Sequence, residues 1–176
     1  IYCLEISNSE KFFLMLLCMK ILFLLLNDHL MDGLSIAGVP QSLKGTAVPI
    51  RYNNFQDLDL IALDDEIGTL KMEVVRSVPP LPNYLEKIQQ ICNEKGIVLI
   101  LDECTSGFRE SFGGIHLNYN ITPDLCMFGK ALGNGFAIAA VIGKKKIMKK
   151  AENSFISSTF WTERIGYLAG IKTLEV

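Results

Sequence analysis

The sequence predicts an α/β fold with a mostly parallel or mixed sheet flanked by helices. Continuous apolar runs at residues 97–101 and 125–128 are typical of strands covered on both faces, as in a parallel sheet. A helical pattern precedes the first run, and strands that alternate with helices favour this class. The 176 residues, 49% of them hydrophobic, are enough for one domain with a sizeable core.

The first elements follow a loop. Residues 27–54 carry scattered glycines and prolines, which are typical of loops. We expect short strands at Ala47–Tyr52 and Thr69–Val75. The second strand is bounded by Gly68 and by a Pro-Pro pair that follows it.

A helix then opens at Pro82-Asn83. Its apolar residues recur at helical spacing, and Gly96 provides the expected stop, since a left-handed residue satisfies the last carbonyls. The residues on this apolar face are Tyr84, Leu85, Ile88, Ile91 and Cys92. The buried strand at 97–101 comes directly afterwards.

The second half of the chain continues the alternation. After the strand at 125–128, a third apolar run at 137–142 predicts another strand. Residues 144–151 form a basic helical segment, whose lysines are expected on a solvated face. Residues 165–174 read as an amphipathic helix.

Composition excludes several classes of function. The formal net charge of −2 and a pI of about 5.7 argue against a nucleic-acid-binding protein, which would show a basic face. The 5 cysteines are odd in number and lack zinc-type spacing, so we expect reduced thiols and a cytoplasmic protein. With only 2 histidines, far apart, no metal site is predicted.

Residues 1–26 are set apart from residues 27–176. The run Phe12–Leu26 is apolar except for Lys20, and at this length it is short for a transmembrane helix. Either a buried or interfacial helix or a segment of non-native sequence explains it better than a membrane anchor, and its origin stays open. No signal-peptide cleavage site follows it.

Two charged residues follow predicted strands at the positions where α/β proteins bind ligands. Asp102 ends the run at 97–101, and Lys130 follows the run at 125–128 within a turn that contains Gly129, Gly133 and Gly135. Such glycines leave room for a flat ligand. Alternatively, Asp102 is a turn cap and Lys130 a surface lysine, because polar residues are common in loops. The spacing does not match the dinucleotide-binding GxGxxG pattern.

The sequences around these residues resemble those of a known family. The stretches VLILDECTSGFR (98–109), TPDLCMFGKALGNGFAIAAVIG (122–143) and FISSTFWTERIG (155–166) resemble class III aminotransferases, and GVPQSLKGTAVPIRYNN (38–54) does so more loosely. The similarity is greatest to the branch that includes glutamate-1-semialdehyde 2,1-aminomutase. It implies a part of the large domain of a fold type I enzyme that depends on pyridoxal 5′-phosphate (PLP), covering residues 27–176.

The resemblance implies roles for residues at the two strand ends. Lys130 matches the lysine that forms a Schiff base with PLP and then moves a proton between substrate and cofactor. Asp102 matches the aspartate that pairs with the pyridine nitrogen. This carboxylate keeps the nitrogen protonated, so that the ring can accept electrons from the substrate. Cys104 stands where the family usually has a small aliphatic residue packed on the ring, and a small soft side chain suits that place.

Three further residues have weaker matches. Thr159 matches a threonine that holds the cofactor phosphate, in the family usually at the other subunit's site, and Ser158 is its neighbour in that contact. Ser157-Ser158-Thr159 is also a plausible turn. Glu73 matches a strand-end glutamate on the substrate side, although a salt bridge there is an equal alternative.

The implied activity is transfer of an amino group between a donor and a carbonyl acceptor, or its shift within one molecule in an aminomutase. The family implies a homodimer. The phosphate loop, the aromatic that stacks on PLP and the small domain of the family find no match here. A catalytically inactive homologue or interaction subunit is therefore the alternative.

Overall fold

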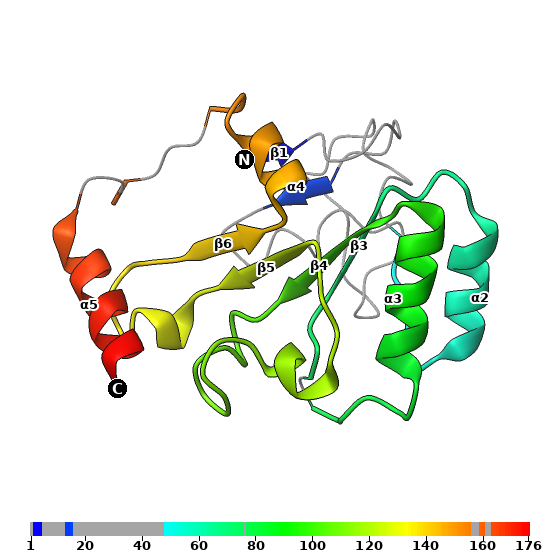
Figure 1. Cartoon of the computed structure of the whole chain (residues 1–176), viewed down its shortest axis with the longest axis horizontal. Helices are drawn as coiled ribbons and strands as arrows, with labels where there is room; N and C mark the ends of the chain where they lie inside the picture. Colours follow the sequence, from blue (N-terminus) through cyan, green and yellow to red (C-terminus); the bar gives the residue numbers. More distant parts are fainter. Residues whose placement is uncertain (1, 5–12, 16–47, 76, 156–158, 161–162) are drawn as a thin grey trace, which may run out of the picture.

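The computed structural model describes residues 2–4, 13–15, 48–75, 77–155, 159–160 and 163–176 (Figure 1). Its main sheet has the spatial order β3-β4-β5-β6, formed by β3 (Thr69–Met72), β4 (Val98–Asp102), β5 (Leu125–Phe128) and β6 (Ala140–Gly143). The strands β3, β4 and β5 are parallel, and β6 is antiparallel to β5. The predicted α/β class with a mixed sheet is confirmed.

The two central strands form the core of the fold. Every residue of β4 and β5 is buried, as their continuous apolar sequences predict. Leu99 and Leu101 face the larger apolar cluster, which includes residues of α2 (Phe55–Leu63) and α3 (Tyr84–Lys95). Val98 and Ile100 face a smaller cluster that includes residues of α4 (Lys145–Ala151). Helices therefore cover both faces of the sheet (Figure 1).

The helix α3 forms as its sequence predicts. Gly96 ends it in the left-handed conformation, with φ 70°, and its N–H bonds the Cys92 carbonyl. The predicted apolar face is the buried one, and each buried Leu or Ile contributes roughly 1.5–3 kcal/mol to the free energy of folding. The buried residues are Tyr84, Leu85, Ile88, Ile91 and Cys92.

The strand predicted at Ala47–Tyr52 is wrong for residues 48–52, and Ala47 lies outside the described residues. Residues 48–51 have no regular structure, and Tyr52 and Asn53 form a turn in which Asn53 has φ 62°. Asn54 then caps α2, because its side chain accepts hydrogen bonds from the Gln56 and Asp57 amides. Pro49 cannot donate to a ladder, and the turn leads directly into the helix.

Two predicted strands are shorter than expected. β3 ends at Met72 instead of Val75, where its partner β4 also nears its end. β6 begins at Ala140, which pairs with the last residue of β5, whereas the apolar run begins at 137. A strand extends only as far as its neighbour offers hydrogen-bonding groups.

The last two helices are confirmed. The basic helix at 144–151 is α4, and the helix at 165–174 is α5 (Arg164–Glu175). α5 lies beside the turn that follows β5 (Figure 1). It buries Gly166 and Gly170 there, while its large apolar residues, Leu168 and Ile171 among them, are exposed.

At the N-terminal end, β1 (Tyr2–Leu4) pairs antiparallel with β2 (Phe13–Met15). Of the two explanations left open for residues 12–26, a helix does not hold for residues 13–15, where backbone pairing with β1 gives a strand instead. The remainder of that segment lies outside the described residues. No helix in the described part of the chain is long and apolar enough to cross a membrane.

Candidate active site

The carboxyl ends of β4 and β5 carry the two residues that the sequence singles out. Asp102 is the last residue of β4 and pairs in register with Met127 of β5. Lys130 follows β5 after Gly129 and opens the 3-10 helix η3 (Lys130–Leu132). Because β4 and β5 are parallel neighbours, both side chains belong to the same edge of the sheet.

The Asp102 carboxylate is buried, with 7% of the residue exposed, and it is held by two partners. Its Oδ2 lies 2.9 Å from the Lys71 Nζ on the neighbouring strand β3, and its Oδ1 accepts the Cys104 backbone N–H at 3.1 Å. Burial alone would raise the Asp102 pKa, but the Lys71 ammonium and Cys104 more than offset this, so the pKa is lowered. Asp102 is therefore an anion at neutral pH.

Lys130 is held in an uncommon backbone conformation. Its φ of 40° lies in the left-handed region, which disfavours non-glycine residues and is found more often at functional sites. Its carbonyl accepts the Asn134 amide at 3.0 Å, and its Nζ donates to the Thr105 hydroxyl at 2.7 Å. The amine is thus directed back to the loop that follows Asp102, although Lys130 as a residue remains exposed.

Cys104 contacts both strand ends, since its backbone N–H donates to Asp102 and its thiol lies near Gly129. A Cβ added to Gly129 would lie 3.5 Å from the Cys104 Sγ, so the thiol packs over the backbone just before Lys130. The pKa of this thiol is raised to about 12, first by burial and then by the Asp102 carboxylate, while Lys130 and Lys71 act in the opposite direction. The side chain is therefore a neutral, partly buried thiol at neutral pH.

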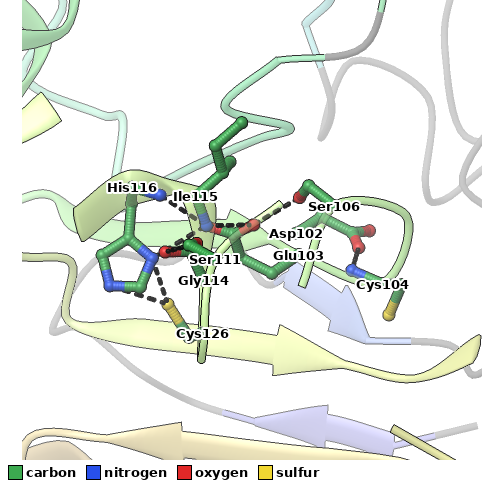
Figure 2. Close-up of polar contacts among 9 residues, drawn as sticks. All are labelled: Asp102, Glu103, Cys104, Ser106, Ser111, Gly114, Ile115, His116 and Cys126. Carbon is green, nitrogen blue, oxygen red and sulfur yellow. Dashed lines mark hydrogen bonds and ion pairs between the residues drawn. The ribbon is translucent and has the colours of Figure 1, made fainter. Parts of the chain in front are cut away.

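The next residue, Glu103, ties the loop after β4 to the helix η2 (Ile115–Tyr119), as Figure 2 shows. Its carboxylate is 0% exposed. Its Oε1 accepts the His116 amide at 2.9 Å and contacts the His116 Nδ1 at 2.7 Å. Its Oε2 accepts the Ile115 amide at 3.2 Å and also bonds the Ser106 hydroxyl. This single side chain fixes both ends of the loop that carries Thr105.

Two glycines allow this loop to pack closely. A Cβ on Gly107 would lie 2.6 Å from the Phe128 ring, and one on Gly114 would lie 2.3 Å from the His116 ring and 2.7 Å from the Glu103 carboxylate. A larger residue at either place would push the loop away from the end of β5 or from Glu103.

The remaining predicted site residues are placed less centrally. Glu73 directly follows β3 and is partly buried. Thr159 lies exposed in a turn, and Ser158 lies outside the described residues. In the part of the chain that the structure describes, Thr159 makes no hydrogen bond to Asp102, Cys104 or Lys130.

Several partners were not foreseen from the sequence. Lys71 is the counter-ion of Asp102. The sequence feature that points to it is a lysine among the apolar residues of β3. Thr105 holds the Lys130 amine and carries no such signal. His116 is a hydrogen-bonding partner of Glu103, with 11% of its side chain exposed.

Comparison with known proteins extends this picture. Residues 46–176 match the aminotransferase class-III family. The chain is 38% identical over 148 residues to the 3-aminobutyryl-CoA aminotransferase of Cloacimonas acidaminovorans and 34% identical over 148 residues to the glutamate-1-semialdehyde 2,1-aminomutase of Natranaerobius thermophilus. Each match covers 79% of this chain but 36% and 34% of the relative, so the chain spans about a third of their length.

Solved structures agree with the fold. The FumI protein of Sphingopyxis sp. MTA144, in its PLP internal aldimine form, superposes with a TM-score of 0.71 at 27% identity. The match covers 79% of this chain and 36% of FumI. The ornithine aminotransferase of Plasmodium yoelii has the same fold, with a TM-score of 0.66 at 22% identity, covering 74% of this chain and 36% of that protein. The chain therefore belongs to the class-III aminotransferase family.

Proposed function

We propose that this chain carries the cofactor-binding edge of a PLP-dependent aminotransferase or of the related aminomutase. The observation that carries the proposal is the arrangement of Asp102 and Lys130 at the ends of adjacent parallel strands, with the Cys104 thiol packed over Gly129, the residue before Lys130. A buried anion, a primary amine and a small neutral side chain fit the three needs of a pyridine aldehyde: a partner for the ring nitrogen, an attachment point and a packing surface.

The residues present define how the cofactor would be held. Asp102 would pair with the protonated ring nitrogen, since its lowered pKa keeps it an anion. Lys130 would bind the aldehyde carbon through its amine, and Cys104 would pack against the ring. When bound, PLP supplies an electron sink that stabilises negative charge on the α-carbon of an amino compound.

The chain's own groups would move the protons. The Lys130 amine would take up and release the proton of the substrate α-carbon, as a general base and then a general acid. Thr105 orients this amine through the 2.7 Å hydrogen bond. Glu103 keeps Thr105 in place by fixing both ends of its loop.

The rest of the site is proposed from the family. The substrates are an amino donor and a carbonyl acceptor, as the names of the relatives suggest. Thr159 and Ser158 are proposed to bind the cofactor phosphate of a partner copy in a homodimer, in agreement with the exposure of Thr159. Glu73 is proposed on the substrate side. Cys92, Cys104 and Cys126 are free thiols, and the proposed setting is a reducing, cytoplasmic one.

Trapping the cofactor on its lysine tests the proposal. The purified chain is incubated with PLP, reduced with borohydride, digested and examined by mass spectrometry. We expect a pyridoxyl group on Lys130 and none in Lys130→Ala, whereas the matched control Lys145→Ala, on the exposed helix α4, keeps the label on Lys130.

The opposite result has a clear meaning. A folded chain that traps no cofactor, or that is labelled equally at Lys145 and Lys130, would contradict the proposal. It would favour the alternative, a catalytically inactive homologue or interaction subunit. If Lys130 is labelled, amino donors can then be screened for conversion to carbonyl products.

A further inference from the structure

Lys71, the counter-ion of Asp102, has no contact with the cofactor or the substrate in the proposed chemistry. Lys71 lies in the middle of β3, opposite Ile100, and its side chain reaches the Asp102 carboxylate at the end of the next strand. The two side chains are only 13% and 9% exposed, so the pair is nearly shielded from water. Burying a lysine in a strand is costly unless its charge is matched, so the pair is a built feature of the sheet.

Both oxygens of Asp102 already have a donor. The Cys104 amide occupies Oδ1 as part of the turn that ends β4, and the Lys71 ammonium occupies Oδ2. The amide is fixed by the backbone, whereas the lysine reaches Oδ2 through a flexible four-carbon chain. A protonated ring nitrogen that approaches this carboxylate must therefore displace the ammonium or share the carboxylate with it. Sharing places two positive charges beside one anion in a poorly hydrated place, where their repulsion is strong.

We propose that Lys71 competes with the pyridine nitrogen of PLP for the Asp102 carboxylate and thereby sets how tightly the site binds its cofactor. This inference rests on the proposed function and adds a determinant of affinity to it. Lys71 is a positioning residue, since it acts on the cofactor only through Asp102. Without cofactor it supplies the counter-charge that keeps Asp102 ionised, and with cofactor it weakens the contact to the ring nitrogen.

The test compares two ligands that differ only at the ring nitrogen. PLP and its 1-deaza analogue, in which the nitrogen is replaced by C–H, are titrated by equilibrium dialysis into the wild-type chain, Lys71→Met and Lys71→Arg. Methionine keeps the length of the side chain and removes the charge, whereas arginine keeps the charge. Dissociation constants are measured, so the readout is independent of turnover.

We expect Lys71→Met to bind PLP about tenfold more tightly or better, the size of one charge-assisted hydrogen bond. The affinity for the deaza analogue should change by less than about twofold, because its ring C–H forms no ion pair with Asp102 whether or not Lys71 is present. Lys71→Arg should keep the wild-type ratio of the two constants. If methionine at 71 prevents folding, as circular dichroism would show, Lys71→Gln replaces it, because glutamine keeps a donor for Asp102 without the charge.

Other outcomes overturn the inference. Equal shifts for both ligands would show that Lys71 acts on the site by packing, and weaker PLP binding by Lys71→Met would show that Lys71 supports the cofactor contact. In either case, borohydride trapping of PLP on Lys130 in the wild type would leave the proposed function standing. If neither the wild type nor Lys71→Met traps PLP, the proposed function fails, and this inference fails with it.

Discussion

Replacing Glu103 by glutamine is the most informative test of how the site is built. The substitution keeps the size of the side chain and one oxygen, but it turns the other oxygen into an NH₂ donor. In the structure each carboxylate oxygen accepts one backbone N–H, that of His116 at Oε1 and that of Ile115 at Oε2. Whichever way the amide turns, one of these buried N–H groups faces a donor and loses its acceptor.

The loss of stability in Glu103→Gln can be estimated from the number of buried donors left without an acceptor. The Ser106 hydroxyl can rotate to accept from the new NH₂, and the His116 ring can change tautomer, so only the backbone donor remains without a partner. A buried donor left without an acceptor costs about 1–3 kcal/mol, and we expect Glu103→Gln to lower the free energy of unfolding by that amount. The total stability of a domain is about 5–15 kcal/mol, so the loss is easily measured.

Urea denaturation followed by circular dichroism measures this change, and the exposed Glu110 of the same loop gives a matched control, Glu110→Gln. The control should stay within about 0.5 kcal/mol of the wild type, as surface substitutions usually do. Amide hydrogen exchange should show lost protection at Ile115 or His116. A loss for Glu103→Gln that equals the control, with both amides still protected, would refute the reasoning that Glu103 holds the loop.

Three further predictions follow from other contacts. The folded-state pKa of Asp102 is lowered, so the stability that its pair with Lys71 provides is complete above about pH 4 and is lost as the pH falls through the lowered value. The difference in free energy of unfolding between the wild type and Asp102→Asn, measured in urea, should therefore shrink toward acid pH. A difference that stays constant would contradict this. Asn54→Ala removes the cap of α2 and should cost about 1 kcal/mol in the same assay, whereas no loss would show that the cap is not needed. Burial raises the pKa of Cys104 to about 12, so iodoacetamide at pH 8 should alkylate this thiol far more slowly in the folded chain than in urea. Intact and peptide mass spectrometry would measure the two rates. Equal rates would contradict the burial of Cys104.

The strands and the helix that local sequence determines were predicted well. β4 and β5 are continuous apolar runs, and a strand buried on both faces is the structure such a run favours beside a parallel neighbour. α3 carries its apolar residues at helical spacing and ends at Gly96, the residue that tolerates a left-handed conformation. In both cases the signal and the structure depend on the same few neighbouring residues.

The region before β3 shows where local propensity fails. Val48, Ile50 and Tyr52 are good strand formers, yet these residues belong to an irregular segment. Strand formers become a strand only if an edge of a sheet is available to them. The informative residue is Asn54, since an N-cap residue before the i, i+3 pair Leu58 and Ile61 predicts the helix α2.

The candidate site divides in the same way. Asp102 and Lys130 could be located because each follows a recognisable strand, and their neighbourhood follows from parallel topology. The partners of these two residues could not be located from the sequence. Lys71 reaches Asp102 from about thirty residues away in the chain, and Thr105 reaches Lys130 from about twenty-five, so each contact depends on how the strands pair. The exposed turn at Thr159 remains a proposal that rests on the family alone.

The adjacent acids Asp102 and Glu103 explain why this strand end serves as a scaffold for chemistry. Successive side chains of a strand point to opposite faces, so the two carboxylates have separate tasks. Asp102 meets Lys71 and the Cys104 turn, where the ligand is proposed to bind, whereas Glu103 meets Ser106 and His116 on the other face (Figure 2). The loop that presents Thr105 to Lys130 is therefore anchored by a residue that need not contact the ligand. In the proposed site, Lys71 therefore sets the affinity of the Asp102 contact while Glu103 keeps the frame of the site unchanged.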